Sequence, residues 1–327
     1  MDQLGRPRFL KREGPRLRAS QPRLAGSGGN QPLIPSSAND AVEQQLHSAL
    51  RSVETAFAGD ALGLVGSMYY GVEDFIRDAL ERKSTKRDKL IVIVDTEGGY
   101  IEVVQRIADT IRYHYPACVE FVIPNYAMSA GTVLVMAGDA IHMDYYSVLG
   151  PIDPQVLSHG KWVPALGYLE KFRELMEKAA TKKGLNDAEM AYLASHFDPA
   201  DLYSYEQAKK LSTQLLKQWL VKYKFKDWKK TATHGKNVTE QMKEKRAAEI
   251  ADALNNTERW NSHARPISME VLRNDLNLRI EDFGSIPGRK ESVRCYHRLL
   301  RDYMGRLQHK WAIHMAGDYA HIGGAHA

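Results

Sequence analysis

The chain has few cysteines and no long apolar run, and these shortages exclude several classes of protein. Its 327 residues include only two cysteines, Cys118 and Cys295, which are too few and too widely separated for a disulfide framework or a cysteine-rich zinc site. The longest apolar runs, at 90–94 and 132–137, are far shorter than the roughly 20 residues of a membrane-spanning helix. No apolar segment of the signal-peptide type follows the basic N-terminus. We therefore expect a cytoplasmic protein without structural disulfides or membrane spans.

Excess positive charge is confined to one end of the chain. The formal net charge is +5, and residues 1–39 contain seven basic and two acidic side chains, so the remainder is neutral overall. This stretch is rich in Pro, Gly, Ser and Arg and poor in apolar residues, which is typical of disordered segments. We expect a disordered basic leader over residues 1–40. Contact with an anionic surface or partner is the alternative interpretation.

Apolar patterns along the body indicate an α/β domain over residues 41–200. The β-branched run at 89–94 predicts a strand buried on both faces. A stretch with apolar residues at helical spacing, 101–111, separates it from a second predicted strand at 119–124, which makes a β-α-β unit. Further predicted elements are helices at 42–53, 71–82 and 129–137 and a strand at 140–143. Residues 201–327 predict a mainly helical C-terminal extension.

Two glycine-bearing turns follow predicted strands, at 95–99 and 127–131. In a β-α-β fold both turns lie at the carboxyl edge of the sheet. A serine at the start of a helix, as predicted for Ser129, has free backbone N–H groups beside it, and a Gly-Gly turn presents another. Together such groups can form an oxyanion hole for acyl transfer. The alternative is that Ser129 only caps a helix and that the glycines only make a turn.

Several motifs carry a resemblance to a known family. They are VDTEGG (94–99), AMSAGT (127–132), MAGD (136–139), LGPIDPQ (149–155) and WNSHARPI (260–267). In this order and spacing the chain resembles the serine dehydrogenase proteinase family, prokaryotic relatives of signal peptide peptidase A and of the Clp proteolytic subunit. The resemblance implies an α/β fold, namely the Clp/crotonase-like β-α-β superhelix, here with a helical C-terminal extension. It also implies assembly into a homo-oligomer.

The resemblance further implies roles for individual residues. Ser129 is the expected nucleophile, and the backbone N–H groups of Gly98, Gly99 and Ala130 are the expected oxyanion hole. The general base stays open, because residues 152–154, which match the position of the histidine in the Clp proteolytic subunit, include no histidine.

Enzymes like signal peptide peptidase use a lysine several dozen residues after the serine, and Lys171 is the best match to it. Lys161 and Lys178 are the fallbacks. His263, within the last motif, is the alternative base; its other interpretation is that it fixes the turn before Pro266.

The expected activity is ATP-independent hydrolysis of peptide bonds by a serine endopeptidase, through an acyl-enzyme on Ser129. The substrate would be a peptide or protein. No phosphate-binding loop or metal-ligand spacing is present, so neither a cofactor nor a metal is expected. The aromatic and lysine-rich stretch 219–230 fits an amphipathic element better than a nucleic-acid surface, and nothing in the sequence supports peripheral membrane contact. The alternatives are a catalytically silent Clp-like oligomeric scaffold that binds a partner, and a crotonase-type acyl-CoA enzyme.

Overall fold

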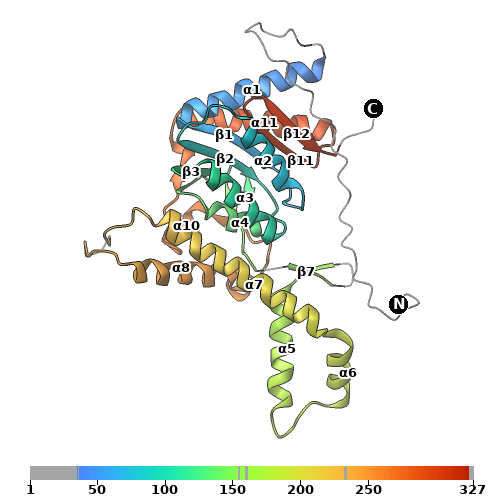
Figure 1. The fold of residues 1–327 in the computed structure, drawn as a ribbon. Helices are drawn as coiled ribbons and strands as arrows, with labels where there is room; N and C mark the ends of the chain where they lie inside the picture. The colour runs from blue at the N-terminus through green and yellow to red at the C-terminus, as the bar shows by residue number, and fades with distance from the viewer. Residues whose placement is uncertain (1–34, 36, 154, 159–160, 232–233, 324–327) are drawn as a thin grey trace. The chain divides into compact units, whose positions relative to one another are not determined.

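The computed structural model describes residues 35, 37–153, 155–158, 161–231 and 234–323. Its centre is a seven-stranded sheet in the order β10-β5-β3-β2-β1-β11-β12 (Figure 1). The first five strands are parallel: β10 (Glu281–Asp282), β5 (Ala140–Met143), β3 (Cys118–Val122), β2 (Lys89–Asp95) and β1 (Asp60–Val65). The hairpin of β11 (Trp311–Met315) and β12 (Asp318–Ile322) continues the sheet, with β11 antiparallel to β1.

Both faces of the sheet are covered, as the apolar run at 89–94 predicts. On β2, Leu90, Val92 and Val94 belong to one apolar cluster, whereas Ile91 and Ile93 belong to another. Helices α2 (Val72–Arg82) and α3 (Ile101–His114) pack in the first cluster, and α1 (Ala38–Phe57) and α11 (Arg289–Arg306) in the second. Side chains of a strand alternate between its faces, so a strand with helices on both sides is apolar throughout.

A second, smaller sheet stands at the carboxyl edge of the main one. It contains β4 (Tyr126–Ala127), β6 (Val148–Leu149) and β9 (Ile267–Ser268), with β6 in the middle. Strand β4 is parallel to β6, and β9 is antiparallel to it. The short helix α4 (Ala130–Val135), buried along its whole length, follows β4 directly. This small sheet brings together three segments from distant parts of the chain.

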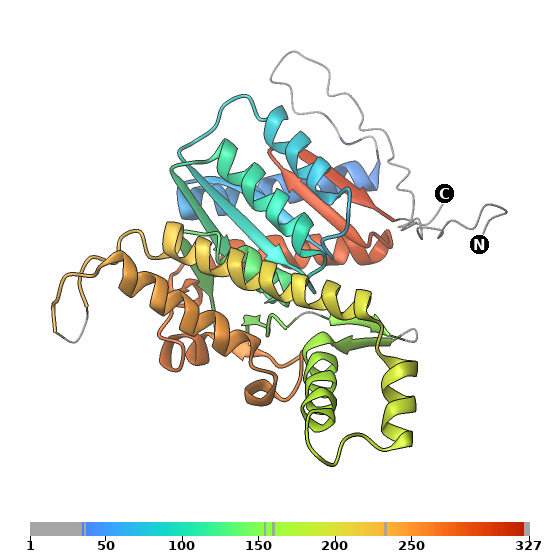
Figure 2. The same ribbon diagram turned by 60° about the horizontal axis from the view of Figure 1, so that its bottom comes forward.

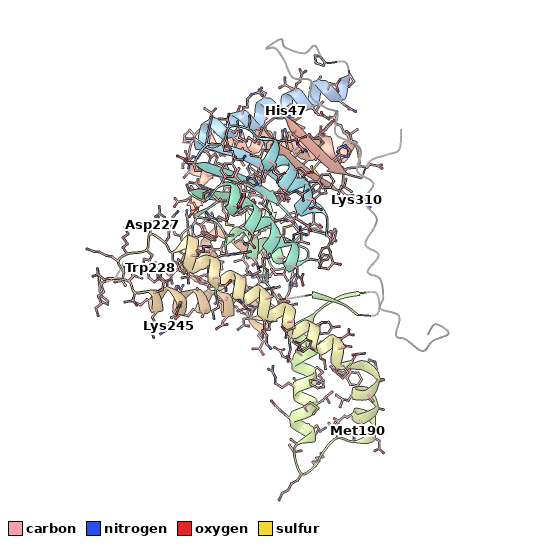
Figure 3. All side chains as sticks on the ribbon, viewed as in Figure 1. His47, Met190, Asp227, Trp228, Lys245 and Lys310 are labelled. Atoms are coloured by element: carbon pink, nitrogen blue, oxygen red, sulfur yellow. The ribbon has the colours of Figure 1, made fainter. Side chains whose placement is uncertain are left out.

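In the sequence, the remaining helices lie between β5 and β10, two neighbouring strands of the main sheet. After the hairpin of β7 (Gln155–Ser158) and β8 (Lys161–Pro164) come α5 (Ala165–Ala179), α6 (Asp187–His196) and α7 (Pro199–Trp219). A π-helical turn (Leu220–Lys224) extends α7, which packs along α8 (Glu240–Asn255); α9 (Thr257–Trp260) and α10 (Met269–Asn274) follow (Figure 2). Figure 3 labels Met190 on α6, where this residue is 56% exposed.

The C-terminal residues do more than form a helical extension. Residues 201–327 supply β10, β11 and β12 to the main sheet and α11 to one of its faces, and residues 35–327 form one compact unit. The domain boundary expected at residue 200 therefore does not separate two units. Of the expected leader, residues 1–34 and 36 lie outside the described residues. No helix within the described residues combines the length and apolarity that crossing a membrane requires.

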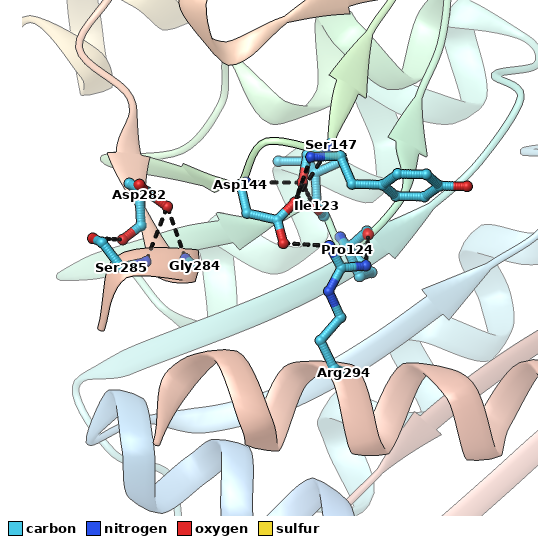
Figure 4. Close-up of polar contacts among 9 residues, drawn as sticks. Ile123, Pro124, Asp144, Ser147, Asp282, Gly284, Ser285 and Arg294 are labelled. Carbon is cyan, nitrogen blue, oxygen red and sulfur yellow. Dashed lines mark hydrogen bonds and ion pairs between the residues drawn. The ribbon is translucent and has the colours of Figure 1, made fainter. Parts of the chain in front are cut away.

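An arginine on α11 ties together the two loops that lead into the small sheet (Figure 4). Arg294 donates to the carbonyl oxygen of Pro124 over 3.0 Å and forms an ion pair with Asp144, whose side chain is 1% exposed. Asp144 also accepts hydrogen bonds from the backbone N–H groups of Tyr146 (2.9 Å) and Ser147 (3.2 Å). The loop of Pro124 leads into β4 and that of Asp144 into β6, so Arg294 fixes the starts of both strands.

Candidate active site

The two glycine-bearing turns meet at the carboxyl edge of the main sheet. Thr96 pairs with Ala127 as a parallel bridge, in which the N–H of Met128 donates to the Thr96 carbonyl over 2.9 Å. A Cβ atom at Gly98 would lie 3.0 Å from the Cβ of Ser129 and 3.2 Å from the nitrogen of Ala130. The glycine turn thus lies directly against Ser129, and only a residue without a side chain fits there.

Ser129 has an unusual backbone conformation, with φ of 53° and ψ of −122° at the residue before α4. This combination lies outside the regions that L-residues ordinarily occupy. Such strain persists only where the surroundings enforce it, and it is concentrated at functional sites. Here the enforcing contacts include the bridge before Ser129 and the hydrogen bond from the N–H of Thr132 to its carbonyl oxygen, at 2.9 Å. Its side chain does not cap the helix, contrary to the alternative interpretation.

Two backbone N–H groups beside Ser129 are available as donors. Gly99 pairs with Met68 through its neighbours: the Gly98 carbonyl accepts from Met68 over 2.7 Å, and the N–H of Tyr100 donates to Met68 over 3.0 Å. In this pairing the N–H of Gly99 points away from Met68. In the described part of the chain, neither the N–H of Gly99 nor that of Ala130 donates a hydrogen bond. Gly98, by contrast, donates to the hydroxyl of Thr96 over 3.0 Å, so Gly99 and Ala130 are the better pair of donors.

The small sheet places a histidine opposite an aspartate. In the antiparallel pair of β6 and β9, Leu149 faces Ile267 and Val148 faces Ser268. Asp153 lies four residues after Leu149, and His263 lies four residues before Ile267. Their side chains are hydrogen bonded, with 2.9 Å between Nδ1 of His263 and Oδ1 of Asp153. Asp153 is 1% exposed, and its Oδ2 has no hydrogen-bond partner among the described residues.

His263 and Ser129 line the same cavity, which has a volume of about 310 Å³. The other residues in its lining are Ser67, Tyr69, Glu97, Gly98, Gly99 and Tyr100. Because Nδ1 of His263 is occupied by Asp153, the nitrogen left to accept a proton is Nε2. A serine and a histidine at one cavity, with a buried aspartate bonded to the histidine, are the parts of an acyl-transfer site.

Buried hydrogen bonds hold the aspartate-bearing segment in place. The hydroxyl of Thr132, on α4, accepts from the N–H of Gly150 over 3.0 Å and lies 2.8 Å from the carbonyl oxygen of Ala127. The N–H of Ile152 donates to the carbonyl of Leu254 over 3.1 Å. The aspartate and Ser129 are therefore positioned by the same helix.

Neither Lys171 nor Lys178 lines this cavity, and the side chain of Lys161, the third expected lysine, lies outside the described part of the structure. Lys171 lies on α5 with 55% of its side chain exposed, and its ammonium bonds Glu174 over 2.8 Å. That hydrogen bond raises the pKa of Lys171, which opposes the loss of a proton that a base needs. Lys178 pairs with Glu189, and Lys161 begins β8. Burial lowers the pKa of Lys224 to about 8, but Lys224 is not in the cavity lining either.

The sequence analysis treated Asp153 only as a departure from the Clp proteolytic subunit, which has a histidine there, and not as a site residue. Its signal was present, because Asp153 and His263 belong to the two motifs LGPIDPQ and WNSHARPI. In the part of the chain that is described, no group of three or more His, Cys, Asp or Glu side chains could hold a metal ion.

Comparisons with known proteins bear on this site. Two uncharacterized proteins of Methanocaldococcus jannaschii are each 37% identical to the chain, one over 101 residues and the other over 89. These matches cover 30% and 27% of the chain, and only 35% and 29% of the relatives' own lengths. The model of the ClpP-like SDH-type serine proteinases matches residues 60–239, more than half of the chain, which include Ser129 and Asp153 but not His263. The chain belongs to the family of ClpP-like SDH-type serine proteinases.

Proposed function

We propose that the protein is a serine endopeptidase in which Ser129, His263 and Asp153 act together. The observation that supports this most directly is the His263–Asp153 pair at the cavity that Ser129 lines. A buried aspartate on Nδ1 fixes the tautomer of the imidazole and leaves Nε2 free to accept the proton of the serine hydroxyl. The family supports a serine-peptidase function; the choice of base is our proposal and replaces Lys171.

In this reaction the Oγ of Ser129 attacks the carbonyl carbon of the peptide bond while its proton passes to Nε2 of His263. The N–H groups of Gly99 and Ala130 donate to the oxyanion that forms. The C–N bond then breaks, and the leaving amine takes the proton from Nε2. A water molecule attacks the resulting ester, again giving a proton to Nε2, and releases the acid as that proton returns to Ser129.

A fluorophosphonate probe, which reacts with activated serines, tests the proposal directly. We expect the native protein to be labelled and to hydrolyse unstructured protein substrates. Ser129→Ala should abolish labelling and hydrolysis, and His263→Ala should lower both at least a thousandfold, because triad members act as a unit. Lys171→Met is the matched comparison and should leave both nearly unchanged, since Lys171 is exposed and outside the cavity.

The variants of the two candidate bases separate the proposed triad from a lysine base. Loss of labelling in Lys171→Met together with retained labelling in His263→Ala would refute the triad. Absence of labelling in the native protein would instead favour the catalytically silent scaffold, the alternative function.

A further inference from the structure

The lining of the Ser129 cavity combines tyrosine rings with the carboxylate of Glu97. Tyr69 and Tyr100 line it and are 55% and 37% exposed. Their ring centroids lie 5.9 Å apart at an interplanar angle of 61°, and the ring of Tyr70 lies 4.9 Å from that of Tyr100. Large exposed aromatic groups beside a cavity are typical of binding surfaces.

These rings stand on a rigid base. The backbone hydrogen bonds between Met68 and the neighbours of Gly99 join the Tyr69 loop to the Tyr100 turn. Ile101, which follows Tyr100 and begins α3, is buried in the core cluster of the main sheet. A preformed aromatic surface costs little entropy on binding, so it can discriminate between ligands.

Among the described residues that line the cavity, Glu97 is the one with a carboxylate. Its side chain is exposed, and the described residues contain no ion pair or hydrogen bond to it, unlike the neighbouring Asp95, which pairs with His297 over 2.7 Å. The negative charge of Glu97 affects the pKa of a nearby tyrosine. Burial, followed by the negative charges of Asp95 and Glu97, raises the pKa of Tyr126.

Glu97 lies two residues before Gly99, whose backbone N–H would donate a hydrogen bond to the oxyanion. Negative charge there opposes the development of a second negative charge in the same cavity. A cation bound to Glu97 would remove that opposition, so the site is best matched to a substrate that brings its own positive charge. A cationic side chain is also attracted to the faces of tyrosine rings.

We propose that Glu97, Tyr69 and Tyr100 form a subsite for an arginine or lysine side chain of the peptide substrate. The carboxylate of Glu97 pairs with the cationic head, and the tyrosine rings contact the stem or the guanidinium plane. Arginine fits better than lysine, because its planar guanidinium stacks on rings and bonds carboxylates through two N–H groups. The inference rests on the proposed peptidase function, since it names the substrate class of the same site.

Binding to the Ser129→Ala variant tests the subsite without requiring hydrolysis. We would measure fluorescence anisotropy of labelled hexapeptides that differ only by Arg, Leu or Glu at one position, with that position moved along the peptide. At one position Arg should bind at least tenfold more tightly than Leu, and Glu more weakly than both. Raising the salt concentration should reduce the advantage of Arg, because the pair is exposed.

Two variants made in the Ser129→Ala background complete the test. Glu97→Gln should bring Arg peptides to the affinity of Leu peptides, whereas Glu102→Gln, an exposed carboxylate on α3 outside the cavity, should keep the preference. Equal binding of Arg and Leu, tighter binding of Leu, or an Arg preference that survives Glu97→Gln would each overturn the inference. Labelling of the native protein by the fluorophosphonate probe remains a separate result, so failure of the subsite and failure of the peptidase proposal are distinguishable.

Discussion

At the scale of single residues, Ser129 is held in a conformation that costs free energy. Its φ of 53° and ψ of −122° are disfavoured for any residue with a Cβ atom but not for glycine. Strain of this kind is worth about 1–3 kcal/mol. Nucleophilic serines are presented on such strained turns in other hydrolases, where the geometry exposes the hydroxyl. The strain at Ser129 is thus a cost to stability that its proposed role explains.

Two substitutions of Ser129 should therefore separate strain from chemistry. Ser129→Gly removes both the hydroxyl and the Cβ, so it should raise the free energy of unfolding by about 1 kcal/mol or more relative to Ser129→Ala, which keeps the Cβ. Both variants should be inactive. Urea unfolding of the two variants measures the difference. An alanine variant as stable as the glycine variant would mean that the backbone of Ser129 is not strained.

At the scale of secondary-structure elements, the local signals were sufficient for much of the fold. The apolar run at 89–94 predicted β2, and helical spacing predicted α2 and α3. The Asp153–His263 pair was not predictable in this way, because it depends on β6 and β9, two strands of two residues each. Strands so short carry no periodic pattern, and Asp153 and His263 are 110 residues apart in the sequence.

The C-terminal hairpin shows a signal that was present but missed. Strands β11 and β12 flank a two-residue turn, Ala316 and Gly317, both with positive φ (47° and 87°). A two-residue turn of this kind between apolar segments indicates a β-hairpin. Its place at the edge of the main sheet, beside β1, could not be deduced, because that pairing joins residues about 250 positions apart.

Substitution of Arg294 tests how α11 holds the loop of Pro124, which leads into β4, and the loop of Asp144, which leads into β6. Arg294→Met leaves the buried carboxylate of Asp144 without its cationic partner, so we expect the free energy of unfolding to fall by about 3 kcal/mol. Probe labelling of Ser129 should also fall, because these loops lead into β4 and β6. Arg298→Met, on the same helix but exposed, is the control and should change stability by less than about 0.5 kcal/mol.

A double-mutant cycle with Asp144→Asn isolates the ion pair from other effects of the arginine. If Arg294 and Asp144 stabilise each other as their contact indicates, the coupling energy should exceed about 1 kcal/mol. Additive effects of the two substitutions would show that the ion pair contributes nothing to holding the loops.

At the scale of the whole molecule, a group of histidines lies where α1, α11 and the C-terminal hairpin meet. Nδ1 of His47, labelled on α1 in Figure 3, lies 2.6 Å from Nε2 of the fully buried His314 on β11. Nδ1 of His314 is 3.1 Å from the hydroxyl of Tyr296 on α11. The rings of His309 and His321 stack at 3.7 Å, and the ring of Tyr319 contacts both of them as well as the ring of His314.

Burial favours the neutral form of His47, His309 and His314 in the folded protein. Burial, and to a lesser extent the charge of the neighbouring histidine, lowers the pKa of His314 to about 3 and that of His309 to about 4. Burial also lowers the pKa of His47, although the carboxylates of Glu43 and Asp318 act in the opposite direction and Arg51 adds to the lowering. The remaining polar neighbour, the hydroxyl of Tyr319, bonds Nδ1 of His309 over 2.9 Å.

The protein should therefore lose stability as the pH falls below about 6.5, the pKa of an unperturbed histidine. Below that pH the unfolded chain binds protons that the folded chain does not, so acid favours unfolding until the pH reaches the lowered folded-state values near 4 and 3. Each such histidine contributes a slope of up to about 1.4 kcal/mol per pH unit. Urea unfolding at pH 7, 6, 5 and 4 measures the total slope.

Substitution of one histidine shows whether this group is the cause. His314→Gln removes one titrating side chain, so the loss of stability between pH 6 and 4 should be shallower by up to about 1.4 kcal/mol per pH unit, even if the variant is less stable at pH 7. His234→Gln, at an exposed position, should leave the slope unchanged. Carboxylates that titrate below about pH 5 act equally in all three proteins, so the difference between slopes reports His314 together with its bonded neighbour His47. Parallel pH profiles for the native protein and His314→Gln would place the acid sensitivity elsewhere in the molecule.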